Sequence, residues 1–231
     1  MSAIADKLQA VRQRIIAAAR AAGRAPESVR LLAVSKTKPL AAIEAAIRSG
    51  QTDFAENYVQ EGVEKCLALK SNGILTWHFI GPLQSNKTRL VAEHFSWVHS
   101  VDRLRLAQRL SEQRPEQCAP LNVCVQVNIS DEKSKSGCAP AEACALCQAI
   151  AALPGLRLRG LMAIPAPTAD VAAQRAAFRS LRQLAQSISQ HASLPLDTLS
   201  MGMSDDLEAA IAEGATMVRV GSAIFGERSY A

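Results

Sequence analysis

The sequence predicts a single (β/α)8 TIM barrel preceded by one extra helix. Short apolar runs alternate with amphipathic stretches along the chain, eight candidate strands can be counted, and each is followed by a helix or by a glycine that opens one. A length of 231 residues suits one such barrel, so we expect residues 1–231 to form one domain. An open doubly wound sheet is the alternative, but no strand is followed by the G-x-G-x-x-G turn of dinucleotide-binding sheets.

The first expected element is the extra helix, from residue 4 to residue 22. Its apolar residues recur three or four positions apart, which is the stripe of an amphipathic helix, and Gly23 follows as its end signal. The same periodicity, with capping and breaking residues, predicts later helices at 40–49, 58–70, 85–94, 104–113, 141–153 and 171–191.

Apolar and β-branched runs mark the strands between these helices. They are expected at 30–34, 52–55, 74–80, 97–101, 121–129, 156–164, 196–201 and 216–220. Pro39, the Gly81-Pro82 pair and Pro165 break three of these runs. The run at 121–129 is the clearest strand and opens into the long polar loop 130–137.

Composition excludes several classes of protein. Hydrophobic residues make up 48% and charged residues 20%, so the chain can bury a core and is neither disordered nor fibrous. The N-terminal segment lacks the continuous apolar core of a signal peptide, and no apolar run approaches the roughly 20 residues that span a bilayer. The net charge of +5 comes without a basic run interleaved with aromatics. We therefore expect a cytoplasmic protein without a membrane or nucleic-acid partner.

Six cysteines are present, and reduced thiols are expected in such a chain. Cys144 and Cys147 have the spacing of a redox or metal motif. They fall, however, inside one amphipathic helix pattern without nearby histidine ligands, so we expect no metal site.

Polar residues follow the expected strands, and the carboxyl ends of barrel strands are where ligand sites lie. Lys36 follows the first strand, where its amine can form a Schiff base with a carbonyl compound if desolvation or the nearby Lys38 favours the neutral form. Asn57 follows the second strand and Lys135 lies in the loop after the fifth. Each also has a simpler interpretation, as a solvated lysine or a helix cap.

The loops after the last two strands suit an anion, as is frequent in barrels. Gly221 lets backbone N–H groups approach closely, and Ser222 adds a hydroxyl at a helix start. Ser200 ends the seventh strand, and we assign it to the same phosphate site. Ser204 and Asp205 are expected to act as helix caps.

Arg219 lies inside the apolar run 217–220, where a permanent charge needs a partner. A buried ion pair is one interpretation. The other is that the guanidinium faces the nitrogen of a bound pyridine ring and keeps it unprotonated. A lysine, a phosphate site and an arginine together indicate pyridoxal 5′-phosphate (PLP).

Seven motifs in order along the chain carry a resemblance to a known family. They read AVSKTKP, FAENYVQE, WHFIGPLQSNK, HSVDR, VQVNISDEKSKSG, LRGLMAIP and LSMGMSDDLEAAIAEGATMVRVGSAIFG. In these motifs the chain resembles the pyridoxal phosphate homeostasis protein family, and the resemblance runs from Leu31 to Gly226. It implies a barrel like the N-terminal domain of alanine racemase.

The resemblance also implies roles for individual residues. Lys36 would carry the cofactor as an internal aldimine, Arg219 would face the pyridine nitrogen, and Asn57 would lie close to the ring. The phosphate would be held by Ser200, Gly221 and Ser222, while Lys135 matches a family lysine proposed to help cofactor transfer.

Three functions remain open at this point. The leading hypothesis is a monomeric, non-enzymatic protein without a catalytic residue, which holds PLP on Lys36, buffers it and passes it to apo-enzymes. The sequence ends soon after the eighth strand, so the second domain of alanine racemase and two-base racemisation are expected to be absent. The alternatives are a racemase-like enzyme and an aldolase in which Lys36 attacks a sugar-phosphate carbonyl directly.

Overall fold

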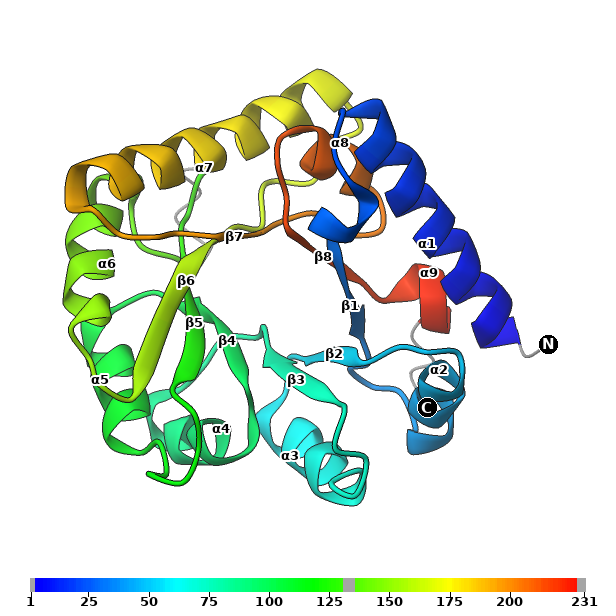
Figure 1. The fold of residues 1–231 in the computed structure, drawn as a ribbon, viewed down its shortest axis with the longest axis horizontal. Helices are drawn as coiled ribbons and strands as arrows, with labels where there is room; N and C mark the ends of the chain where they lie inside the picture. The colour runs from blue at the N-terminus through cyan, green and yellow to red at the C-terminus, as the bar shows by residue number, and fades with distance from the viewer. Residues whose placement is uncertain (1–2, 131–135, 228–231) are drawn as a thin grey trace.

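A computed structural model of the chain, which describes residues 3–130 and 136–227, contains a closed barrel of parallel strands. The strands are β1 Arg30–Val34, β2 Asp53–Glu56, β3 Thr76–Phe79, β4 Trp97–Val101, β5 Leu121–Gln126, β6 Leu156–Met162, β7 Thr198–Ser200 and β8 Met217–Val220. They pair in chain order, and β8 pairs with β1 to close the ring, with Ala33 opposite Val220. Figure 1 shows the helices arranged around this ring.

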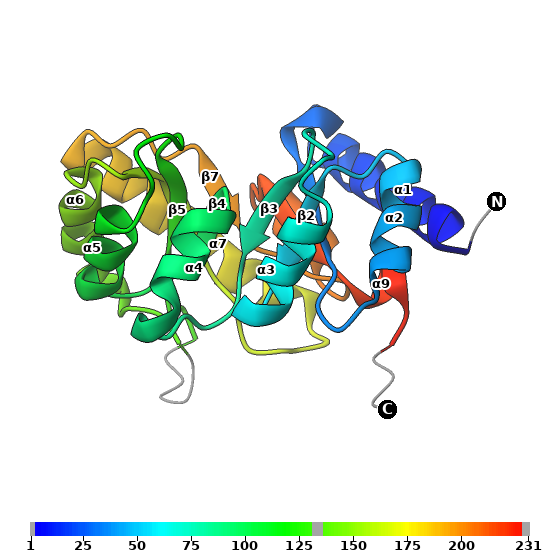
Figure 2. The same ribbon diagram turned by 90° about the horizontal axis from the view of Figure 1, so that it is seen from below.

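The helices connect the strands along the outside, as the side view in Figure 2 shows. They are α1 Ala3–Ala21, α2 Leu40–Arg48, α3 Val59–Ala68, α4 Thr88–His94, α5 Leu104–Glu112, α6 Ala143–Ala151, α7 Val171–Ala192, α8 Leu207–Ala212 and the single turn α9 Ser222–Phe225. The extra helix α1 packs against α8 and α9 (Figure 1). The predicted barrel with an N-terminal helix is confirmed.

The element boundaries differ from the predicted ones by a few residues. The prediction of a strand to residue 129 was too long, because β5 ends at Gln126 and Asn128 turns to bond the carbonyl of Cys138 at 3.0 Å. The predicted helix 85–94 begins instead with a 3-10 turn, Ser85–Lys87, before α4. The strand therefore ends earlier, and the α-helix begins later, than the apolar pattern predicts.

Two apolar cores follow from the alternation of side chains along each strand. Outward-facing side chains such as Val218 and Val220 pack against the helices in the larger core. A smaller cluster fills the barrel interior: Leu32, Val34, Ala55, Ile80, Trp97, Cys124, Met162 and Met217. Because Met217 faces inward, Arg219 two residues later faces the interior as well.

Candidate functional site

Lys36 lies in a tight turn directly after β1. The last ladder bond of this strand runs from the N–H of Ser35 to the carbonyl of Ala55 at 3.0 Å. The chain then turns through Lys36 and Thr37, whose φ of 61° is a left-handed conformation, before Pro39 precedes α2. The turn leaves the Lys36 side chain half-buried and lining a cavity at the carboxyl ends of the strands.

A buried ion cluster holds this turn in place. Nζ of Lys65, on α3, donates to the carbonyl of Ser35 at 2.6 Å, to Oε1 of Glu56 at 2.8 Å and to Oε1 of Glu61 at 2.6 Å. Ser35 donates its hydroxyl to Glu56 at 2.6 Å, and the N–H of Thr37 donates to Glu61 at 2.5 Å. Burial raises the pKa of Glu56, against the opposing effect of Lys65. The members of this cluster are separated along the chain, so no local sequence pattern reveals it.

The cavity itself has a volume of about 270 Å³. This is close to the lower end of the roughly 300–1,000 Å³ that small-molecule sites occupy. Its lining combines the ends of β1, β2, β3 and β8 with the loops after β6 and β7: Val34, Lys36, Lys38, Asn57, Ile80, Ile164, Met203, Ser204, Asp205, Arg219, Gly221, Ser222 and Gly226. Three of these side chains are cationic and one is a carboxylate, so the lining favours an anionic ligand.

Asn57 contributes a buried polar atom to the cavity. Its Oδ1 is buried and has no hydrogen bond among the described residues. Its backbone is fixed by Gly81, where an added Cβ would lie 2.1 Å from the carbonyl oxygen of Asn57. A buried polar group without a partner is costly, so this amide is suited to a polar atom of a ligand in the cavity.

Two loops bring hydroxyl groups together on the side of β8. Gly221 lies against β1, and an added Cβ there would come within 3.2 Å of the carbonyl oxygen of Val34. The hydroxyl of Ser222 lies 3.3 Å from that of Ser204, and Arg14 from α1 donates to the carbonyl of Ser204 at 2.9 Å. Ser204, which we predicted only as a helix cap, therefore lines the cavity beside Gly221 and Ser222.

Arg219 is buried, with 3% of its surface exposed. Nη1 donates to Oγ of Ser200 at 2.9 Å and Nη2 donates to the carbonyl of Ala163 at 3.0 Å. Burial lowers the pKa of its guanidinium to about 10, so the group is still a cation at neutral pH. Among the described residues no carboxylate lies within ion-pair distance of it, and one side of Arg219 lines the cavity.

The structure brings five of the six predicted site residues to this cavity: Lys36, Asn57, Arg219, Gly221 and Ser222. Ser200 is placed differently, because it is fully buried behind Arg219 and is absent from the lining. Its hydroxyl bonds Arg219 and lies 2.8 Å from Nδ1 of His99. Lys135 lies outside the described residues.

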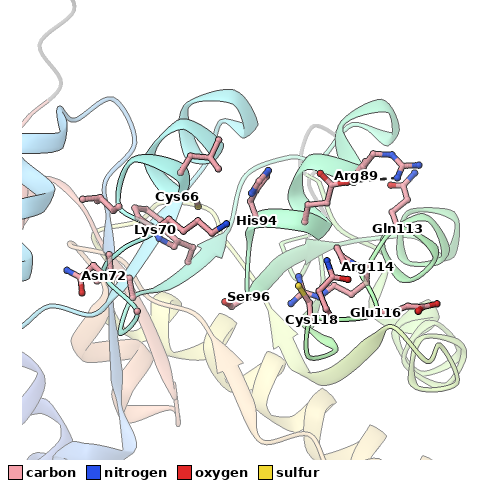
Figure 3. Close-up of a pocket in the computed structure, with 18 of the residues that line it drawn as sticks. Cys66, Lys70, Asn72, Arg89, His94, Ser96, Gln113, Arg114, Glu116 and Cys118 are labelled. Carbon is pink, nitrogen blue, oxygen red and sulfur yellow. Dashed lines mark ion pairs between the residues drawn. The ribbon is translucent and has the colours of Figure 1, made fainter.

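A second, larger hollow of about 850 Å³ lies at the opposite, amino-terminal ends of the strands. Figure 3 shows its walls, with Lys70 and Asn72 on one side and Arg114 and Glu116 on the other. Trp77 and Ser96, at the starts of β3 and β4, line its floor. Ligand sites of such barrels lie at the carboxyl ends, and this hollow is lined by charges of both signs, so we assign the site to the smaller cavity.

The cysteines do not line the cavity. All six cysteines are free, and Cys144 and Cys147 lie on α6. In the described ranges no three histidine, cysteine or acidic side chains are grouped so that they could hold a metal ion. Nor do those ranges contain a helix long and apolar enough to cross a bilayer.

Fold and site together define a class: a parallel α/β barrel whose cavity presents an amine, an arginine and hydroxyl groups to a small anionic carbonyl compound. Residues 7–229 match the family model described as the N-terminal domain of alanine racemase. The Pseudomonas aeruginosa pyridoxal phosphate homeostasis protein is 63% identical, with 100% of this chain and 98% of that protein covered. The Escherichia coli pyridoxal phosphate homeostasis protein is 58% identical, with 100% of this chain and 99% of that protein covered. The chain belongs to the pyridoxal phosphate homeostasis protein family.

Solved structures agree with this assignment. PipY of Synechococcus elongatus PCC7942, with PLP bound, is 41% identical and superposes with a TM-score of 0.85 over 96% of this chain and 100% of that one. Alanine racemase of Corynebacterium glutamicum superposes with a TM-score of 0.66 at 18% identity, covering 97% of this chain and 62% of that one. The second likeness concerns the fold alone.

Proposed function

We propose that this protein binds PLP reversibly through a Schiff base on Lys36 and thereby buffers the free aldehyde. The observation that carries the proposal is the convergence of Lys36, Arg219 and the Gly221–Ser222 loop on one cavity. The 41% identical PipY structure, which contains PLP, supports it. The residues also fit the group, because the cavity is cationic and Asn57 offers a buried polar atom that no group in residues 3–130 and 136–227 bonds.

Each side chain has a role that follows from its chemistry. The Lys36 amine would bond the aldehyde carbon, whose oxygen would leave as water with the two amine protons, and the nearby Lys38 favours the neutral amine that this requires. Arg219 donates toward the ring nitrogen and disfavours its protonation, since two cations would then be adjacent. Gly221, Ser222 and Ser204 receive the phosphate. When bound, PLP supplies an electrophilic aldehyde and a ring whose strength as an electron sink depends on protonation of its nitrogen.

Ser200 enters this proposal through Arg219. Its hydroxyl accepts from the guanidinium at 2.9 Å and so supports the group that meets the ring. The phosphate role that we assigned to Ser200 from the sequence passes in this proposal to Ser204, which lines the cavity.

Absorption spectroscopy tests the binding. Purified protein mixed with PLP is expected to turn yellow, and borohydride is expected to fix the cofactor on the peptide that carries Lys36. Lys36→Ala is expected to abolish both results, while Lys70→Ala, at an exposed lysine in the opposite hollow, keeps them. A colourless protein would instead favour the sugar-phosphate aldolase.

The proposal includes release of PLP to apo-enzymes and no robust turnover of amino acids. A ring nitrogen held unprotonated by Arg219 is a weak electron sink, which supports the second part. Loaded protein should activate an apo-enzyme better than the same concentration of free PLP, and equal activation would reject delivery. Exchange of the Cα hydrogen of an amino acid, lost in Lys36→Ala, would instead establish the racemase-like alternative.

A further inference from the structure

A chain of polar side chains crosses the interior of the barrel behind Arg219. Oγ of Ser200 lies 2.9 Å from Arg219 Nη1 and 2.8 Å from His99 Nδ1. Nε2 of His99 lies 2.9 Å from Nδ1 of His78, and Nε2 of His78 lies 3.2 Å from Oδ1 of Asp53. The chain thus connects β8, β7, β4, β3 and β2.

The two ends of this chain fix the direction of every hydrogen bond in it. At one end the Asp53 carboxylate can only accept, so Nε2 of His78 donates to it, and a neutral His78 then accepts at Nδ1 from Nε2–H of His99. A neutral His99 protonated on Nε2 carries a lone pair on Nδ1, which accepts from the Ser200 hydroxyl. At the other end Arg219 can only donate, and it donates to a lone pair of Ser200 Oγ.

Burial favours the neutral form of both histidines. His78 and His99 are both 0% exposed, and Trp97 stacks on His78 with ring centroids 5.5 Å apart. Burial lowers the pKa of His78, and it lowers that of His99 well below the ordinary value, with the positive charge of Arg219 acting in the same direction. A second cation beside Arg219 is therefore disfavoured.

Asp53 ends the chain near the amino-terminal mouth of the barrel. Its side chain is 15% exposed, accepts from the hydroxyl of Thr52 at 2.9 Å and lies 3.4 Å from Nη1 of Arg30. Burial raises the pKa of Asp53, but the hydrogen bond from His78 and the neighbouring charges outweigh this effect and bring it below the ordinary value. The chain therefore begins on a cation, ends on an anion and is neutral between them.

We propose that His99 and His78 are positioning residues of the cofactor site. His99, oriented by His78, accepts a hydrogen bond from the Ser200 hydroxyl. The lone pairs of Ser200 then face Arg219, and this holds the guanidinium at the edge of the cavity. Together with the carbonyl of Ala163, this hydrogen-bonded chain compensates the buried charge of Arg219 in place of a direct ion pair, and its own carboxylate, that of Asp53, lies at the end remote from Arg219. This inference rests on the proposed binding of PLP.

Nitrogen-15 NMR of the protein without PLP tests the direction of the chain. The sequence has four histidines, so His94 and His191, which do not belong to this row of hydrogen-bonded side chains, serve as internal references. At neutral pH we expect His78 and His99 each in a single neutral form with the proton on Nε2. A proton on Nδ1 of His99, or rapid exchange between its two tautomers, would overturn the proposed direction.

Equilibrium binding of PLP tests the positioning role. His99→Leu removes the acceptor for Ser200, and we expect the dissociation constant to rise about tenfold, the scale of losing a hydrogen bond that orders a charged group. His99→Gln can accept with Oε1 and donate with Nε2, so it is expected to recover most of the affinity. His94→Leu, in the opposite hollow, is the matched control and should bind as the native protein does.

Ser200→Ala covers the case in which His99→Leu does not fold, because it removes only one oxygen. We expect it to weaken PLP binding and to allow both tautomers of His99. Native affinity in both His99→Leu and Ser200→Ala would reject the positioning role. Failure of the native protein to take up PLP would instead reject the proposed function, and the NMR result would still stand independently.

Discussion

Three lysines near the end of β1 differ because their surroundings differ. Lys36 and Lys38 are both half-buried and line the cavity, and Nζ of Lys38 donates to the carbonyl of Glu227 at 2.7 Å. Lys65 is buried and bonds two glutamates. Lys36 directly follows β1 at the cavity, while Lys65 supports the turn that presents it.

Loss of the Lys65 amine should destabilise the fold. Lys65→Met leaves Glu56 as a buried carboxylate without its cation, so the free energy of unfolding is expected to fall by about 3–5 kcal/mol. Urea denaturation measures this change. The double variant Glu56→Gln, Lys65→Met should recover part of the loss, and Lys87→Met, at an exposed lysine, should stay within about 0.5 kcal/mol. A loss below about 1 kcal/mol in Lys65→Met would contradict the role of the cluster.

Cysteine reactivity should follow burial. Cys118 and Cys144 are partly exposed, whereas the other thiols are buried, and burial raises their pKa values: to about 12 for Cys66, to about 11 for Cys138, to about 12 for Cys147, and still higher for Cys124. Brief treatment with iodoacetamide should therefore modify Cys118 and Cys144 first. Peptide mass spectrometry checks this order, with unfolded protein as the control in which all six react. Early labelling of Cys147 would contradict the described packing of α6.

At the scale of elements, close approaches between adjacent strand ends shape the cavity. Gly81 follows β3 and lies against the backbone of Asn57 after β2. The two loops are therefore too close for a side chain to fit between them. Gly221 after β8 lies similarly close to Val34 at the end of β1. Neighbouring strands therefore deliver Asn57, Lys36 and Ser222 to one edge of the barrel.

Gly81→Ala tests this close approach. The added methyl would lie 2.1 Å from the carbonyl oxygen of Asn57, so the loop must shift. We expect a loss of about 1–3 kcal/mol in stability and weaker PLP binding, because Asn57 lines the cavity. Gly73→Ala is the matched control, since nothing lies within 4 Å of a methyl group there. Equal stability and affinity in the two variants would contradict the described packing.

At the scale of the whole molecule, the barrel interior combines apolar residues with the polar chain from Arg219 to Asp53. The histidines of this chain are neutral in the folded protein but can bind protons once unfolded. Because burial lowers their folded pKa values, the unfolded state binds more protons as the pH falls below about 6.5. Stability should consequently decrease on acidification.

Urea denaturation between pH 7.5 and 5 measures this dependence. Each buried histidine contributes a slope of up to about 1.4 kcal/mol per pH unit below its unfolded pKa. Glu56, whose pKa burial raises, acts in the opposite direction at the acidic end of the range. The double variant His78→Leu, His99→Leu, if it folds, should show a shallower slope, and a stability that rises as the pH falls would contradict neutral histidines in the native protein.

Much of the fold and part of the site were accessible from local pattern. Strand and helix periodicity predicted the barrel, and residues at strand ends such as Lys36 and Arg219 drew attention because their chemistry contrasts with the apolar runs around them. His78 and His99 also lie within such runs, and this signal could have found them. Ser200 was assigned to the phosphate because its position at a strand end does not reveal which face of the barrel it occupies.

The sequence by itself determined the order of strands and helices, the family and the residue that carries the amine, because periodicity, turn residues and motifs are local properties of a chain. Only the tertiary structure decided which distant groups meet. Closure of the barrel brings β8 beside β1 and so places Arg219 near Lys36. Inward-facing positions on five strands join into one hydrogen-bonded chain for the same reason. Contacts between segments far apart along the chain depend on register and closure, which no single stretch of sequence encodes.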